Sequence, residues 1–398
     1  MSGHPHTLHL PPPERLVPSK FAATGIFAGL SAVGLILSVI GAMLDRVQFA
    51  YSWFFALYFF FSIALGAFFW VTLHFACNSS WSVLMRRTWE NVLGLFPVLF
   101  VLFLPLMLPG FSEILWKYMS AEKQATLDHA KDWLNPMSFF VRYILYALYF
   151  ILAGLYYRRQ SVEQDTDGSP VHTVRMIDHS YLALVIFGVL ETFLSIDWLM
   201  GLEWRWSSSL FGAYNFGLCA QAGMAAGIVL VAILRSAGFL GAMNSEHFYM
   251  MGKLLFGFTI LWAYFAFGQY LLIWYANIPE ESIFYYHHNH GGWMYLCFLI
   301  VVGKFMFPVI YLLAQDTKKS LRALTTIAIW VLFMHGVELW WFVMPYAQSV
   351  SLLTLLQDAV SFVTIGSILG YAYIRIAATA SLIPTRDPRM VECLTITN

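Results

Sequence analysis

Several ionisable side chains lie inside long apolar runs of the sequence, where a lipid bilayer would exclude them unless they had partners or a role. A charge at the bilayer centre costs about 2.5–3.5 kcal/mol on insertion scales. The residues of this kind are Glu191, Asp197, Lys253, Lys304, His335, Glu338, Asp358 and Arg375. Such a series can relay protons across a membrane, or it can neutralise itself as a structural network. The residues alone leave both explanations open.

Two spacings group some of these side chains. His335 and Glu338 are three residues apart, so on a helix they share one face. The pair suits a proton relay because imidazole titrates near neutral pH. Lys253, Gly257 and Tyr264 also fall on one side of a helix and predict a polar stripe. Ordinary core packing is the simpler explanation of Tyr264.

Haem and di-iron chemistry have less support. A di-iron site in a helical bundle needs a second Glu-x-x-His helix and two further glutamates, and the sequence lacks them. Haem b needs histidines at matching depth on facing helices. His74 could pair with His247 or His179 in this way, but nothing in the sequence requires it. We therefore predict that the chain binds no redox cofactor and no metal inside the membrane.

Outer-loop residues form a second set of candidates. Glu280 and Glu281 follow an aromatic stretch that is typical of a membrane interface. His287, His288 and His290 could bind a metal there, although loop histidines more often face solvent or a partner subunit.

The elements that must position these residues are membrane spans. The chain has 398 residues, of which 60% are hydrophobic and only 11% charged, against about 25% in ordinary soluble proteins. The net charge is zero, so no basic surface exists for nucleic acid. The four cysteines are far apart, which excludes CxxC zinc sites, cysteine-ligated iron–sulfur clusters and the CxxCH signature of c-type haem. The high hydrophobic fraction and the low charged fraction together indicate an integral membrane protein.

Ten apolar runs are long enough to cross a hydrocarbon core of about 30 Å, which needs roughly 20 residues. They cover residues 21–44, 51–76, 89–109, 137–157, 179–199, 210–234, 250–275, 290–314, 321–345 and 357–380. We expect an all-α membrane domain over 21–380, a leader at 1–20 and a tail at 381–398. The longest connections are expected at about 110–136 and 158–178, the second as a flexible loop.

The distribution of lysine and arginine predicts the orientation. Thirteen of these residues fall on the side that holds both ends of the chain, five on the other side and four within or at the ends of helices. Both termini are therefore expected in the cytoplasm. On this topology the acids gather in the outer half of the membrane and the bases in the inner half, as in two half-channels that meet near the middle.

Two longer stretches are more specific. One runs from Ser195 to Gly212 and begins SIDWLMGLE; the other runs from Gln269 to Glu281 and reads QYLLIWYANIPEE. Both closely resemble the F subunit (ActF) of bacterial alternative complex III, a quinol:cytochrome c or quinol:oxidase oxidoreductase, within the NrfD/PsrC-like membrane proteins. A third similarity is the run His335-x-x-Glu338-x-Trp340-Trp341. The likeness extends from about the first predicted helix to the tenth.

The resemblance implies a fold of two four-helix bundles, helices 2–5 and 6–9, with helices 1 and 10 outside them. It implies a bacterial inner membrane protein whose partners are a homologous C subunit, small helical membrane subunits, and haem c and iron–sulfur subunits. It leaves open whether a terminal cytochrome oxidase is a further partner. In that family the quinol site is assigned to the C subunit, while the F subunit holds no redox cofactor and is proposed to carry proton half-channels.

The family pattern falls on Asp197, Glu203, Glu280, Glu281, His335 and Glu338. One departure is visible, because the family usually has Pro-His where this chain has Trp204-Arg205. A histidine at the outer mouth is therefore in doubt. Arg205 could instead pair with Glu203 at the surface, an interaction worth about 0–1 kcal/mol.

The resulting hypothesis is a non-redox subunit of a quinol-oxidising complex, not catalytic alone, that scaffolds its neighbour and offers buried groups for protons. Asp197, Glu338 and His335 would form the outer half-path, and Lys253 and Lys304 would face the inner one. Glu191 would bridge the two, and Asp358 and Tyr264 are further candidates. The lysines could equally be fixed counter-ions.

Two alternatives remain. In the first, the chain binds quinone itself, with His335 and Glu338 beside the head group as proton acceptors. In the second, it is a secondary transporter. Such folds often have broken helices at matching positions in two halves, and the helix with Pro97 and Pro105 has no obvious counterpart.

Overall fold

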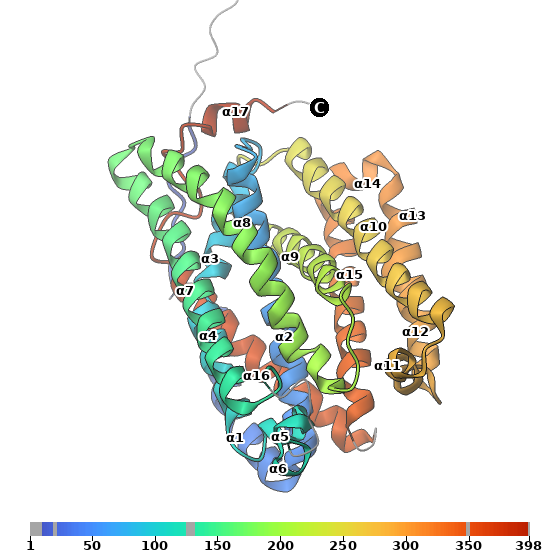
Figure 1. Ribbon diagram of the computed structural model, residues 1–398. Coiled ribbons are helices and arrows are strands. Elements are labelled where there is room, and N and C mark those ends of the chain that lie inside the picture. The colour runs from blue at the N-terminus through green and yellow to red at the C-terminus, as the bar shows by residue number, and fades with distance from the viewer. Residues whose placement is uncertain (1–9, 19–21, 125–131, 348–350, 397–398) are drawn as a thin grey trace, which may run out of the picture.

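The computed structural model describes residues 10–18, 22–124, 132–347 and 351–396 (Figure 1). Within these residues the secondary structure is helical, apart from one isolated bridge between Arg15 and Ser381. Ten spans are long and apolar enough to cross a membrane. The prediction of an all-α, multi-span membrane protein is confirmed.

The ten spans lie close to the predicted runs. In chain order they are α1 (Ala22–Leu44), α2 (Arg46–Ala76), α3 with α4 (Val83–Leu93, Phe96–Met107), α7 (Pro136–Asp167), α8 (Val171–Trp198), α9 (Phe211–Ser236), α10 (Ser245–Ala276), α12 to α13 (Trp293–Leu313), α15 (Leu321–Val343) and α16 (Leu352–Ala377). Between α12 (Trp293–Ile300) and α13 (Phe307–Leu313) the helix widens into a π-helical turn, η4 (Val301–Met306).

Short helices connect the spans. They are α5 (Ser112–Leu115), η2 (Lys117–Met119), α6 (Ala121–Gln124), η3 (Met200–Glu203), α11 (Pro279–Asn289), α14 (Gln315–Lys319) and η5 (Met344–Tyr346), and a further short helix, α17 (Met390–Leu394), lies in the tail after the last span. Part of the predicted long connection at 110–136 is thus helical, and residues 125–131 lie outside the described part. Of the predicted leader, residues 10–18 are described.

The spans form two groups that meet at α2 and α9. In the first group α2 packs on α3, α4 and α8, and α7 packs on α3, α4 and α8. In the second, α9 packs on α10 and α15, and both of these contact the α12–α13 span. Helices α1 and α16 pack on each other outside these groups, with α16 against α2. This pairing agrees with two four-helix bundles and two peripheral helices.

Glycines allow the two bundles to approach closely. A Cβ atom on Gly66 of α2 would lie 2.0 Å from the Cys219 carbonyl oxygen of α9. A Cβ atom on Gly223 of α9 would lie 2.6–2.8 Å from the backbone around Gly66. Small residues at such a crossing let backbones pack directly against each other within lipid. The α2–α9 contact is therefore the seam of the fold.

The prediction of a flexible loop at 158–178 is wrong. Helix α7 continues to Asp167 and α8 begins at Val171, so only three residues connect them. Gly168 ends α7 in the left-handed conformation, with φ of 70°, and the Gln164 side chain donates to the Ser169 carbonyl and the Thr173 hydroxyl. The helices extend beyond their apolar stretch as polar helix, which hydropathy alone does not detect.

The two ends of the described chain meet at one end of the molecule, where α17 lies in Figure 1. The Leu382 N–H donates to the Glu14 carbonyl at 2.8 Å. The tail is also bound through Asp387, whose carboxylate accepts hydrogen bonds from Arg86 at 2.8 Å and Arg389 at 3.0 Å. The tail at 381–396 is therefore a packed part of the fold.

Candidate functional site

An ion pair lies buried in the second bundle. Lys304 in η4 donates to Glu338 in α15, and both side chains are completely buried. Glu338 also accepts hydrogen bonds from the Tyr214 hydroxyl in α9 and from the Trp262 indole in α10, the latter at 3.0 Å. The Lys304 ammonium group lies 4.7 Å from the centroid of the Trp262 ring. Each charge therefore has partners, as a buried ion pair requires.

A second carboxyl group lies on the other side of α9. Asn215, the neighbour of Tyr214, donates to Glu191 of α8 at 2.7 Å. The Tyr58 hydroxyl of α2 donates in turn to the Asn215 side-chain oxygen at 2.9 Å. Glu191 is fully buried. One turn of α9 thus connects the Lys304–Glu338 pair with Glu191, because adjacent residues bind the two carboxyl groups.

His335 lies one turn before Glu338 on α15 and is completely buried. Its Nε2 atom lies 2.8 Å from the Ser62 hydroxyl, which itself donates to the Phe59 carbonyl. Nε2 must therefore carry the hydrogen. Nδ1 then presents a lone pair, for which the described residues supply no hydrogen-bond partner. His335 and Glu338 share a helix face as predicted, but they bind different partners.

We call this group of side chains the buried polar centre. Its members come from six elements, namely α2, α8, α9, α10, η4 and α15. They are Ser62, Glu191, Tyr214, Asn215, Trp262, Lys304, His335 and Glu338.

Asp197 belongs to a separate site. Its carboxylate accepts two hydrogen bonds from Arg142 at 2.7 and 2.9 Å, one from Tyr146 at 2.6 Å and one from Trp133 at 3.1 Å. The Arg142 guanidinium also lies 4.0 Å from the Trp133 ring centroid. This bidentate pair joins α7 to α8. None of these hydrogen bonds leads to the other predicted members of the outer half-path.

Asp358 joins three helices in the same manner. It accepts hydrogen bonds from Ser52 and, at 3.1 Å, from Gln48, both of α2. Trp340 of α15 donates to it at 2.9 Å. These contacts attach α16 to both bundles.

The expected polar stripe on α10 does not reach the interior. Tyr264 is 69% exposed, and Gly257 is exposed with no atom near the position of a Cβ. The Lys253 ammonium group lies 4.5 Å from the Tyr249 ring centroid and makes no contact with the buried polar centre. The three residues share a face, but α10 packs on α9 through the opposite one. Their role in a proton path stays a prediction.

The outer-loop candidates divide into two groups. Glu203 pairs with Arg205 at 3.1 Å, as expected, and also with the Nδ1 atom of His287 at 3.0 Å. Glu203 thus meets a histidine from α11 as well as its neighbour Arg205. Glu280 and Glu281 are exposed at the start of α11.

The remaining loop histidines bind carbonyl groups. His288 is completely buried, and its ring nitrogens lie 2.7 Å from the Phe284 carbonyl and 3.3 Å from the Phe342 carbonyl. Burial lowers the pKa of His288 to about 4, although these carbonyls partly offset it. The Nδ1 atom of His290 lies 2.7 Å from the Tyr286 carbonyl. Across the described ranges, no three His, Cys, Asp or Glu side chains are placed to hold a metal ion.

A cavity of about 650 Å³ lies against the buried polar centre. Its walls come from α9, α10, α11, α12, η4 and α15, and most of its lining is aromatic or aliphatic. Tyr214 and Trp262 form part of the wall, and they are the two residues that donate to Glu338 beside Lys304. Exposed lining residues such as Phe267 and Phe298 place the cavity at the lipid-facing side.

Comparison with known proteins adds no family to this description. No protein-family model matches the chain, and no curated protein is significantly similar to it. The chain's own residues establish a helical, multi-span membrane protein with a charged, hydrogen-bonded interior.

Proposed function

We propose that the chain is a membrane subunit of a respiratory quinol-oxidising complex of the alternative complex III type. Its buried polar centre would take up and release protons while partner subunits carry the electrons. The stretches at 195–212 and 269–281 support the family, and the ten-span architecture is compatible with it. The homologous C subunit, the haem c and iron–sulfur subunits and the bacterial inner membrane belong to this proposal.

The observation that carries the proton role is the link through α9. Glu338 is paired with the ammonium group of Lys304, whereas among the described residues Glu191 accepts only from Asn215, and the residues that bind the two carboxyl groups, Tyr214 and Asn215, are adjacent on α9. Burying a net charge is costly, so with Lys304 charged and paired with Glu338 the second carboxyl group, Glu191, is favoured in its protonated form. The arrangement therefore supports a site that holds a mobile proton. His335, with its free Nδ1 lone pair, supplies a further acceptor.

Proton release by the assembled complex in vesicles tests the proposal. Glu191→Gln removes one carboxyl group without leaving Lys304 unpaired. We expect quinol oxidation within twofold of the wild type and fewer protons released per quinol. Glu163→Gln is the control, because Glu163 forms an exposed pair with Arg159 on α7. An unchanged proton stoichiometry in Glu191→Gln would leave the centre a structural network.

A second candidate function is direct quinone binding by this chain. The cavity beside Tyr214 and Trp262 favours it, because its lining is apolar and it ends at donors bound to a buried carboxylate. Quinol oxidation needs an apolar site for the ring and tail and a proton acceptor near the hydroxyls.

A photoreactive quinone distinguishes this candidate from the first. If the cavity binds quinone, the probe labels this chain, and Ala263→Trp, which fills the cavity, abolishes the labelling. Ile329→Trp is the matched control, because Ile329 lines a different cavity, between α13 and α15. Labelling of a partner subunit alone would refute direct binding here.

A further inference from the structure

The π-helical turn η4 leaves one backbone carbonyl without a donor from its own helix. In an α-helix the carbonyl of residue i accepts from the N–H of residue i+4. Here the Phe307 N–H donates to the Val302 carbonyl, five residues back, so it is not available to Gly303. The next residue is Pro308, which has no N–H. In the π-helical register the Gly303 carbonyl therefore has no donor from its own helix, whereas in an α-helical register it would accept from Phe307.

A side chain from the neighbouring span supplies that donor. The Trp330 indole of α15 donates to the Gly303 carbonyl at 2.7 Å. An unsatisfied carbonyl in an apolar environment would cost about 1–3 kcal/mol. The hydrogen bond therefore removes the penalty that the π turn would otherwise carry.

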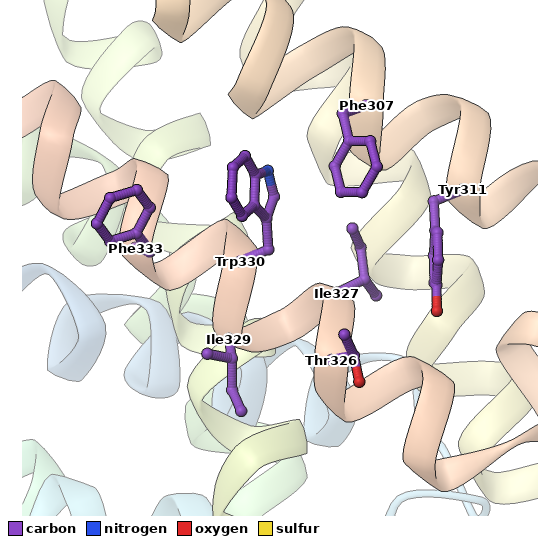
Figure 2. A pocket seen from close by; sticks show the side chains of 7 residues that line it. All are labelled: Phe307, Tyr311, Thr326, Ile327, Ile329, Trp330 and Phe333. Atoms are coloured by element: carbon purple, nitrogen blue, oxygen red, sulfur yellow. The ribbon is translucent and has the colours of Figure 1, made fainter.

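Packing alone does not hold the indole in place. Figure 2 shows Trp330 between Phe307 and Phe333, with Tyr311 beyond Phe307. These residues line a pocket of about 510 Å³ between α13 and α15. Trp330 itself is only partly buried. The Phe307 and Phe333 rings also contact the indole, and the hydrogen bond to Gly303 fixes the direction of its N–H.

The turn in question carries Lys304, the next residue after Gly303. Return of η4 to an α-helical register would remove the additional residue from the turn and rotate Lys304 by about 100°, the angle per residue of an α-helix. The ammonium group would then leave Glu338. Functional sites often contain such single π-helical turns.

We propose that Trp330 is a positioning residue for Lys304. Its indole N–H replaces the backbone donor that Pro308 lacks, and this bond maintains the turn that keeps Lys304 on Glu338. The functional importance of the Lys304–Glu338 pair rests on the proposed function, but the positioning of Lys304 by Trp330 does not.

Infrared spectroscopy of the purified full-length chain in detergent tests the proposal. The carboxylate band of Glu338 is identified by its loss in Glu338→Gln, and Lys304→Met gives its position when the ammonium group is absent. Trp330→Phe removes the indole donor, and 3-benzothienylalanine at position 330 removes only the N–H while preserving the ring shape. We expect both to displace the band as Lys304→Met does. Phe333→Leu, in the same pocket, is expected to leave it unchanged.

A band unchanged in both Trp330 variants, with folding confirmed by circular dichroism, would overturn the proposal. The proposal would also fail if Phe333→Leu displaced the band equally, because general packing would then explain the effect. Neither result would bear on proton release by the complex. Failure of the proposed function would instead appear as an unchanged proton stoichiometry in Glu191→Gln.

Discussion

Glu338 receives hydrogen bonds from three different elements, and its energetics depend on all of them. Lys304, Tyr214 and Trp262 each donate to its carboxylate, and the Lys304 and Glu338 side chains are completely buried. Removing one member of a buried ion pair leaves the other charge uncompensated, at a cost of about 3–5 kcal/mol. The pair is therefore more sensitive to single than to double replacement.

We predict that Lys304→Met lowers the free energy of unfolding in detergent by about 3–5 kcal/mol. The double variant Lys304→Met, Glu338→Gln should recover most of this loss, because no unpaired charge remains. Chemical unfolding followed by circular dichroism measures both. Equal destabilisation in the single and double variants would mean that packing, not charge, dominates at this position.

His288 makes a pH-dependent contribution outside the membrane spans. Its pKa falls from about 6.5 in the unfolded chain to about 4 in the fold, mainly through burial. Below pH 6.5 the unfolded state therefore binds the proton first, and the fold loses stability as the pH falls. At about 1.4 kcal/mol per pH unit the loss reaches about 3 kcal/mol at pH 4.

We expect hydrogen exchange of α11 to quicken between pH 6.5 and pH 4, after correction for the intrinsic rate. In His288→Gln this additional acceleration should disappear, because the side chain no longer titrates. His290→Gln is the control, since His290 is exposed on the same helix. The same pH dependence in His288→Gln would assign it to another group.

At residue scale, sequence patterns predicted several of the buried charges but not their partners, and they missed Arg86, Arg87 and Glu90. Glu191, Asp197, Lys304, His335 and Glu338 are all buried, as their place in apolar runs required. Lys304 and Glu338 pair with each other, Asp197 pairs with Arg142, and the other partners are tyrosine, tryptophan, asparagine and serine side chains. Such contacts depend on the rotation of each helix about its axis, which a single sequence does not specify.

At the scale of elements, the tail residues 381–396 are held by charge. Burial alone would raise the pKa of the Asp387 carboxyl, but the charge of Arg86 and the hydrogen bonds from Arg389 outweigh it and hold the pKa well below its usual range. A carboxyl with a depressed pKa stabilises the fold above its unfolded pKa of about 3.9. The stabilisation is lost only when the pH falls through the folded pKa.

We predict that Asp387→Asn frees the tail and raises its proteolysis rate at neutral pH at least tenfold. In the wild type the protection should be constant from pH 8 to about 5, because Asp387 stays ionised there. Glu392→Gln in α17 is the control, because Glu392 is exposed. Proteolysis as slow as in the wild type would show that apolar contacts of the tail are sufficient.

The positions of the helices along the chain were predicted more accurately than where each helix ends or which of its faces points to the interior. Hydropathy located all ten spans, because the length needed to cross lipid is a strong constraint. It ended the helix of α7 where apolar residues stop, although the helix continues to Asp167. Periodicity placed Lys253 and Tyr264 on one face of α10 but could not show that this face is exposed. The π turn at Lys304 was missed, and Pro308 was the available signal.

For the whole molecule, the close contact of α2 with α9 is the decisive feature. We predict that Gly223→Ala lowers the melting temperature in detergent, because its Cβ would lie 2.6–2.8 Å from the backbone of α2 around Gly66. Gly188→Ala is the matched control, since Gly188 lies in α8 with no atom within 4 Å. That substitution should be neutral or raise stability by about 0.5–1 kcal/mol. Equal effects of the two would remove the steric explanation.

The glycine seam also limits how the molecule can move. Backbones that meet without side chains between them cannot slide past each other unless the intervening contact is first broken. The halves should therefore travel as one rigid piece, which disfavours the rocking motion that a solute carrier needs to open alternately to each side. Any movement coupled to chemistry is then confined to side chains and local changes of helix register. Tethering α2 to α9 by a cross-link should accordingly leave turnover of the assembled complex intact.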